Sequence, residues 1–246
     1  MLRDLPTRTE REPVVGDGVG GDETTAIDAA AERVILERLR AIDGATIVSE
    51  EVGLVEGGGR LRIVVDPIDG SLNAKRGIPF FSLSVAIAEG DTMDDVVFAY
   101  VYDFGSGEEW LAEQGKGASL NGADLGPIYP KDEIEILSFE ATLTSSVAEK
   151  AAAMVGFAYR LRIMGSLALS LCHLAAGRVD AVCSLKAARA VDIAAAQLLV
   201  RERGLAIDLP EAPPFGSAPL DTEGRSRVVA AGTPAVCAEL FAALAG

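Results

Sequence analysis

Apolar and polar positions divide the chain into two halves with different rhythms. Residues 24–42 carry apolar side chains at intervals of three and four, which predicts a helix with one buried face. Short apolar runs separated by turn residues then predict strands at 45–49, 61–66, 80–88, 96–103 and 108–113. The first half is therefore predicted as one helix followed by a largely antiparallel sheet.

From residue 134 onward, predicted strands and helices alternate. The strands fall at 134–139, 159–164, 179–184 and 227–231, and the helices at 145–155, 166–176, 191–204 and 234–244. Such alternation predicts a layered α/β arrangement. We therefore expect an N-terminal α+β half, residues 1–126, and a C-terminal α/β half, residues 127–246. Residues 1–23 are polar and glycine-rich, and are predicted to form a tail or a mobile loop.

Composition and charge narrow the class of protein. Hydrophobic residues make up 49% of the 246 positions and charged residues 24%, which is typical of a soluble globular enzyme. The formal charge of −15 argues against a nucleic-acid partner, because a polyanion needs a basic face. It does not exclude a small phosphorylated substrate, since bound divalent cations reverse the local sign of a site.

Cysteine and histidine usage excludes other chemistries. His173 is the only histidine, so a His–Ser–Asp hydrolase or a site with several histidine ligands is very hard to build here. Cys172, Cys183 and Cys237 lie in apolar segments, as buried reduced thiols do. Residues 1–12 do not resemble a signal peptide, and no stretch reaches the roughly 18 apolar residues of a membrane span. We expect a cytoplasmic protein.

The most informative segment is Asp66-Pro67-Ile68-Asp69-Gly70-Ser71. A strand ends at Asp66, Pro67 interrupts its ladder, and Asp69 follows just beyond the bend. Two neighbouring carboxylates repel each other unless cations bridge them, and hard divalent ions prefer oxygen ligands of this kind. Gly70 lets a phosphate approach the backbone. Taken alone, the segment also fits a simple turn capped by an aspartate.

Other acids lie at element ends far away in the sequence. Glu50 and Glu51 follow the strand at 45–49, Asp192 opens a helix, and Asp28 lies in the first turns of another. Each of them alone fits a structural role, such as a helix cap or a solvated side chain.

Together, these segments resemble the inositol monophosphatase family. The resemblance is strongest to archaeal-type members that act on both inositol-1-phosphate and fructose-1,6-bisphosphate. It rests on segments that occur in family order between about residue 20 and residue 204. They are residues 21–28, 48–51, 66–81, 115–122, 165–166 and 189–194.

The resemblance implies a layered αβαβα sandwich of the sugar phosphatase type. It also implies that Mg²⁺ is held by Glu50, Asp66, Asp69, Asp192 and the carbonyl of Ile68. Asp28 and the Ser71 hydroxyl would orient and deprotonate the attacking water, and residues 16–23 would form a mobile loop over the metals. Many relatives have threonine in place of Ser71, and the hydroxyl is kept.

Substrate binding is expected from Gly70, Ser71, Ser166, Lys186 and Arg189, with Arg160 and Arg162 near the site. The family usually places a charged residue seven positions before the helix aspartate. Here that position is Leu185, which bears on sugar specificity rather than on the chemistry.

The implied function is a Mg²⁺-dependent phosphomonoesterase. Two or three ions would activate water to hydrolyse inositol-1-phosphate, fructose-1,6-bisphosphate or both, in a lithium-sensitive homodimer. Two alternatives stay open. One is a nucleotide phosphatase of the same family, acting on 3′-phosphoadenosine 5′-phosphate or NADP, and the other is a catalytically silent acidic binding protein.

Overall fold

Two sheets form the frame of the molecule in the computed structural model, which describes residues 4–19, 23–129, 131, 133–140, 143–212 and 214–245. The larger has eight strands in the order β10-β9-β8-β7-β6-β5-β3-β4, and the smaller has five in the order β12-β11-β13-β15-β14. Only β3 and β5 are parallel in the larger sheet, so the expectation of a largely antiparallel first half is confirmed.

The strands of the larger sheet are β3 (Thr46–Ser49), β4 (Gly53–Val55), β5 (Arg62–Asp69), β6 (Ser82–Ala88), β7 (Val96–Asp103), β8 (Glu109–Glu113), β9 (Gly117–Leu120) and β10 (Ala123–Asp124). Those of the smaller sheet are β11 (Ile134–Glu140), β12 (Ala158–Arg162), β13 (Ala181–Ser184), β14 (Ala206–Asp208) and β15 (Val229–Ala231). The helices are α1 (Arg8–Arg11), α2 (Ala26–Leu39), α3 (Ser71–Arg76), α4 (Thr144–Ala151), α5 (Leu167–Ala175), α6 (Ala190–Glu202) and α7 (Pro234–Ala245), with 3-10 turns at Met93–Asp95, Ala152–Met154 and Phe215–Ser217.

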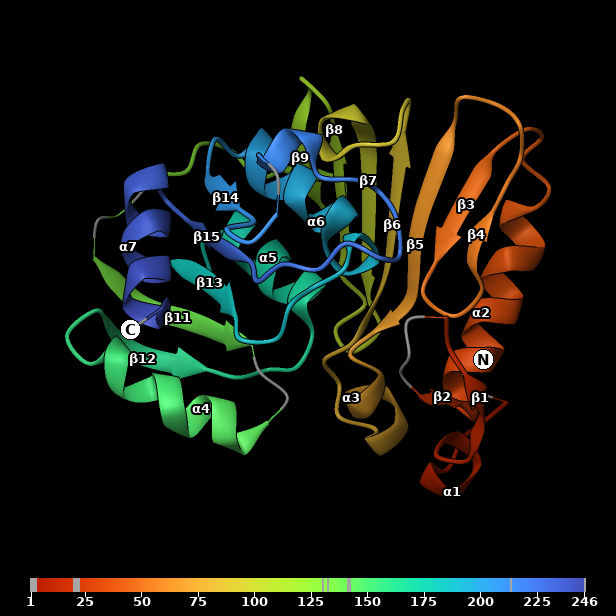
Figure 1. Ribbon diagram of the computed structural model, residues 1–246, viewed down its shortest axis with the longest axis horizontal. Helices are drawn as coiled ribbons and strands as arrows, with labels where there is room; N and C mark the ends of the chain where they lie inside the picture. The colour runs from red at the N-terminus through yellow and green to blue at the C-terminus, as the bar shows by residue number, and fades with distance from the viewer. Residues whose placement is uncertain are drawn as a thin grey trace.

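Helices and sheets alternate in five layers (Figure 1). Helix α2 covers the outer face of the larger sheet, α5 and α6 lie between the two sheets, and α4 and α7 cover the outer face of the smaller sheet. This is the αβαβα sandwich that the sequence led us to expect. The larger sheet comes from residues 46–124 and the smaller from 134–231, but α5 and α6 pack on both. The division at residues 126/127 therefore stays a prediction about organisation.

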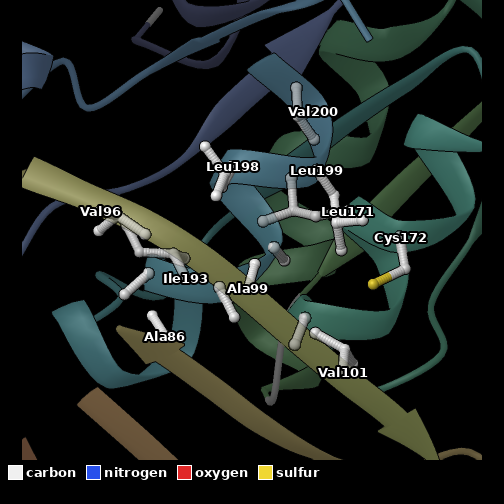
Figure 2. Packing of buried hydrophobic residues seen from close by; sticks show 14 of the residues in the cluster. Ala86, Val96, Ala99, Val101, Leu171, Cys172, Ile193, Leu198, Leu199 and Val200 are labelled. Carbon is white, nitrogen blue, oxygen red and sulfur yellow. The ribbon is translucent and has the colours of Figure 1, made fainter. Parts of the chain in front are cut away.

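The central layer supplies the largest buried cluster. Strand β7 presents Val96, Ala99 and Val101 to the apolar faces of α5 and α6, where Leu171 and Leu199 are completely buried (Figure 2). Burying such side chains contributes roughly 1.5–3 kcal/mol each. Apolar packing therefore holds the central helices in place and fixes the position in space of the first turn of α6.

Three features differ from the sequence-based predictions. The expected tail over residues 1–23 is wrong at the described positions, because α1 is followed by β1 (Val14–Asp17), which pairs with β2 (Glu23–Thr25). Residues 20–22, part of the expected loop, lie outside the described residues. Strands β4, β9, β10 and β14 and helix α3 were not predicted, because they have only two to six residues and so too few positions to show a period.

Strand β5 also continues past Pro67, where we expected it to end. Asp66 pairs with Ser84 and Asp69 pairs with Ser82, so three steps along β5 match two steps along β6. The extra residue forms a β-bulge, which absorbs the proline without ending the strand.

Core packing gives the first prediction. Leu171→Ala should lower the free energy of unfolding by about 2–5 kcal/mol, because it opens a cavity in the central layer. Val155→Ala is the control, since Val155 is 84% exposed and should change the free energy of unfolding by less than about 0.5 kcal/mol. Denaturant titration measures both. Equal losses would show that the central layer does not carry the stability assigned to it.

Candidate active site

Strand register brings three of the predicted acids to one face of the larger sheet. Val48 on β3 pairs with Val64 on β5, so Glu50, two residues beyond Val48, stands level with Asp66. In a regular strand, Asp66 and Asp69 would face opposite sides, because their separation is an odd number of residues. The bulge adds one residue and turns both toward the side of Ser82 and Ser84, which faces the central helices.

Helix α6 brings the fourth acid to the same place from the central layer. Asp192 lies in its first turn, where one of its carboxylate oxygens accepts the backbone N–H of Arg189 at 2.7 Å. The Arg189 guanidinium, 10% exposed, donates to Asp192 at 3.1 Å and also to Glu50. Arg189 therefore joins β3 of the first half to α6 of the second.

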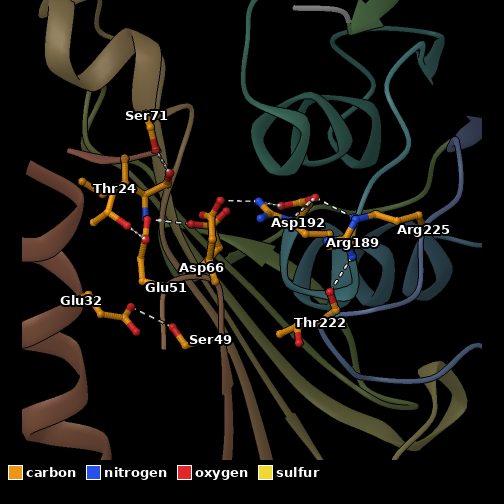
Figure 3. Close-up of polar contacts among 12 residues, drawn as sticks. Thr24, Glu32, Ser49, Glu51, Asp66, Ser71, Arg189, Asp192, Thr222 and Arg225 are labelled. Atoms are coloured by element: carbon orange, nitrogen blue, oxygen red, sulfur yellow. Dashed lines mark hydrogen bonds and ion pairs between the residues drawn. The ribbon is translucent and has the colours of Figure 1, made fainter. Parts of the chain in front are cut away.

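These residues surround a cavity of ≈ 600 Å³. Figure 3 shows Asp66 between Glu51 and Ser71 on one side and Asp192 and Arg189 on the other. Eight acidic side chains line the cavity: Glu23, Asp28, Glu50, Glu51, Asp66, Asp69, Glu140 and Asp192. Its basic lining side chains are Lys75, Lys186 and Arg189. The cavity is therefore strongly acidic.

Burial of these acids shifts their protonation. Burial, reinforced by the charges of neighbouring acids, raises the pKa of Asp66 well above its ordinary value. Burial likewise raises the pKa of Asp69 to about 7, against the hydrogen bonds from Ser166 and Ala168. The pKa of Glu50 also rises to about 7 through burial, although Arg189 opposes the shift. Three acids that are costly to ionise beside each other favour a compensating cation.

The two residues expected to act on water both line the cavity. Asp28 is 5% exposed, and one of its oxygens accepts the Thr25 backbone N–H at 3.0 Å, as part of the N-terminal cap of α2. Its other oxygen is buried and has no hydrogen-bond partner among the described residues. The Ser71 hydroxyl donates to the Ile68 carbonyl at 3.0 Å rather than to Asp28.

The expected substrate-binding residues fall into two groups. Gly70, Ser71, Lys186 and Arg189 line the cavity. Gly70 has φ +94°, and a Cβ there would lie 3.0 Å from the Gly165 carbonyl oxygen, so glycine is required. Ser166 is buried and not among the lining residues; its hydroxyl donates to Asp69 instead.

The structure corrects the expectation for two arginines and adds lining residues that the sequence did not single out for the site. Arg160 and Arg162 lie on β12 and do not line the cavity, and Arg160 instead pairs with the exposed Glu135. Lys75 and Glu140 do line it. Neither was predictable: Lys75 follows the motif on the unpredicted helix α3, and Glu140 ends a strand with no motif of its own.

The lining residues fit a hard cation by their chemistry. They offer carboxylate oxygens and one backbone carbonyl, the ligands that Mg²⁺ prefers, and the buried Asp28 oxygen lacks a partner. Among the described residues, no three Asp, Glu, His or Cys side chains are grouped closely enough to hold a metal ion as they stand. Two of the predicted ligands are instead bridged by Arg189, so an incoming cation meets carboxylates already in contact with a guanidinium.

Comparison with known proteins identifies the same family that the sequence motifs resemble. A model of the inositol monophosphatase family matches residues 7–245. The fructose-1,6-bisphosphatase/inositol-1-monophosphatase of Thermococcus kodakarensis is 38% identical over 191 residues, which is 77% of this chain and 71% of that protein. The protein of the same name from Archaeoglobus fulgidus is 33% identical over 233 residues, 94% of this chain and 87% of its own.

A solved structure described as an inositol monophosphatase–fructose 1,6-bisphosphatase agrees with a TM-score of 0.86 at 27% identity, covering 99% of this chain and 93% of that one. Fold, cavity and relatives together define a phosphoric monoester hydrolase. The chain belongs to the inositol monophosphatase family, a metal-dependent family, as its motifs led us to expect. In addition, no helix among the described residues is long and apolar enough to cross a membrane.

The raised pKa of Asp69 predicts a pH effect on stability. Asp69 keeps its proton in the folded metal-free protein up to about pH 7, whereas its ordinary pKa is 3.8. Between these values the folded state binds more protons than the unfolded state, so this contribution to stability is lost as pH rises. The free energy of unfolding, wild type minus Asp69→Asn, should therefore fall between pH 4 and pH 8, by at most about 1.4 kcal/mol per pH unit. A difference that rises with pH would contradict the assignment.

The ion pairs of Arg189 give a second prediction. In the metal-free protein, Arg189→Ala should cost about 3–5 kcal/mol of unfolding free energy, because it leaves Glu50 and Asp192, whose side chains are only 16% exposed, without their cation. Mg²⁺ should restore part of this loss. Arg160→Ala is the matched control: its pair with Glu135 is exposed on both sides and should contribute about 0–1 kcal/mol. Equal losses in the two variants, by urea unfolding, would refute the bridging role.

Proposed function

We propose that this protein is a Mg²⁺-dependent phosphomonoesterase that hydrolyses inositol-1-phosphate, fructose-1,6-bisphosphate or both. The observation that carries the proposal is that four acids line one cavity: Glu50, Asp66, Asp69 and Asp192. They come from the end of β3, from β5 with its bulge, and from α6. The names of the archaeal relatives support the two substrates. Two or three ions, a cytoplasmic location and a homodimer belong to the same proposal, and the buried free cysteines are consistent with a reducing compartment.

In the proposed mechanism, the phosphate ester binds in the cavity. The acids that line this cavity cannot all stay ionised without a cation. Glu50, Asp66, Asp69, Asp192 and the Ile68 carbonyl would hold Mg²⁺. When bound, Mg²⁺ neutralises phosphate charge and lowers the pKa of a coordinated water. Residues from both halves of the chain would thus meet at the reacting phosphate.

Two side chains would then act on the water. Asp28 would accept a proton from it, a role supported by its unpartnered buried oxygen and by its place in the cavity lining. The Ser71 hydroxyl, which donates to Ile68, still has lone pairs that can accept a hydrogen bond and so orient the same water. Lys75 and Lys186 would attract the anionic substrate to the mouth of this acidic cavity.

A phosphate-release assay tests the proposal and separates the alternatives. Inositol-1-phosphate and fructose-1,6-bisphosphate should be hydrolysed only with Mg²⁺, and faster than NADP or 3′-phosphoadenosine 5′-phosphate. A preference for the last two would favour the nucleotide phosphatase. No release from any of the four, with Mg²⁺ binding retained, would favour a silent binding protein.

Removing the central carboxylate gives a sharper prediction. Asp66→Asn should lower kcat/KM by a hundredfold or more, since about 3 kcal/mol or more of transition-state stabilisation depends on metal-assisted charge neutralisation. Asp94→Asn is the matched control, because Asp94 is exposed and pairs with Arg201 on the surface. Near-normal turnover of Asp66→Asn with Mg²⁺ would contradict the proposed mechanism.

A further inference from the structure

Glu140 is a buried acid of the cavity that neither the sequence nor the proposed mechanism explains. It is the last residue of β11, it is 6% exposed, and it lies on the half of the chain that carries α5 and α6. A buried carboxylate is costly unless it is well hydrogen-bonded. Its partners therefore indicate its role.

Four donors meet this carboxylate. One oxygen accepts the hydroxyls of Ser138 at 2.9 Å and Ser170 at 2.7 Å, and the backbone N–H of Met164 at 3.4 Å. The other oxygen accepts the backbone N–H of Gly165 at 2.9 Å. Three of the donors share one oxygen and the fourth binds the other, so both carboxylate oxygens are engaged by the protein. Glu140 is thus engaged by the protein itself, unlike Asp28, which has a buried oxygen without a partner.

The loop that Glu140 holds, residues 164–166, contacts a predicted metal ligand of the first half, Asp69. Its Ser166 hydroxyl donates to Asp69, and the nearby Ala168 backbone N–H donates to the same Asp69 oxygen at 2.8 Å. The Met164 carbonyl accepts from the Asn73 amide at 2.7 Å. A shift of this loop would therefore move the Asp69 carboxylate.

We propose that Glu140 is a positioning residue that fixes residues 164–166 by hydrogen bonds and, through Ser166, orients the Asp69 carboxylate for metal binding. The inference rests on the proposed function, because it gives Asp69 its role as a ligand. It assigns Glu140 no contact with metal or substrate. Neutral hydrogen-bonding groups of the same shape can therefore replace it.

Two substitutions distinguish positioning from a direct role of the charge. In Glu140→Gln, the amide oxygen can still accept from Gly165, and the amide N–H₂ can donate to the Ser138 and Ser170 hydroxyls, which rotate to accept. Only the long 3.4 Å bond from the Met164 N–H is lost. This variant should keep Mg²⁺ affinity and kcat/KM within about threefold of wild type. Glu140→Ala should lose about 10–100-fold in both, as loss of outer-shell partners of metal ligands typically does.

The readouts are Mg²⁺ binding by calorimetry, phosphate release, and hydrogen exchange of the backbone amides of residues 164–168. Exchange should speed up in Glu140→Ala but not in Glu140→Gln. Glu135→Ala is the matched control on the same strand, where the side chain is exposed. Combining Glu140→Ala with Ser166→Ala should lower Mg²⁺ affinity no further than the more damaging single change, because both act through Asp69.

Three results would overturn the inference: equal losses in the Gln and Ala variants, unchanged amide exchange in Glu140→Ala, or additive losses in the double variant. Failure of the proposed function is distinct from these. In that case the wild type itself neither binds Mg²⁺ nor releases phosphate. The amide exchange of residues 164–168 would still test whether Glu140 holds the loop.

Discussion

Repulsion between buried carboxylates is the constraint on which this structure depends. Glu50, Asp66 and Asp69 lie at one end of one sheet, where burial and mutual charge make ionisation costly. The protein meets part of this cost with Arg189, which bridges Glu50 to Asp192. The remaining cost of ionisation favours binding either of protons or of divalent cations by these acids. A metal-dependent phosphatase uses the divalent cations. The high cost of ionising these neighbouring acids is thus what favours metal binding in the proposed chemistry.

The rest of the fold holds these acids together against that repulsion. Apolar packing of α5 and α6 between two sheets fixes the start of α6, and with it Asp192 and Arg189. The bulge at Pro67 turns Asp66 and Asp69 to the same face. The loop at residues 164–166 anchors Asp69 from the other half of the chain. No single element contains the site, because its lining residues come from several elements, among them α2, β5, β11 and α6, and from the loops between elements.

Prediction from the sequence succeeded where a local pattern was long enough to be distinctive. The spacing of apolar residues predicted helix α2 and strands β5 to β8. The segment from Asp66 to Ser71 predicted a cation site, which stays a prediction, and both of its aspartates line one cavity. Arg160 and Arg162 show the limit, because both are basic and near in sequence to Ser166, yet they lie outside the cavity. Charge and proximity along the chain do not report the direction in which a side chain points.

The sequence by itself determined the layered fold class, the family and the acids expected in the site, because these depend on periodicity and short motifs. Only the tertiary structure decided that Glu50 stands level with Asp66, that Arg189 spans two acids, and that Glu140 holds the loop beside Asp69. These relations join residues up to 139 positions apart. They depend on strand register, a one-residue bulge and helix packing, which are set by the whole core rather than by any local stretch of chain.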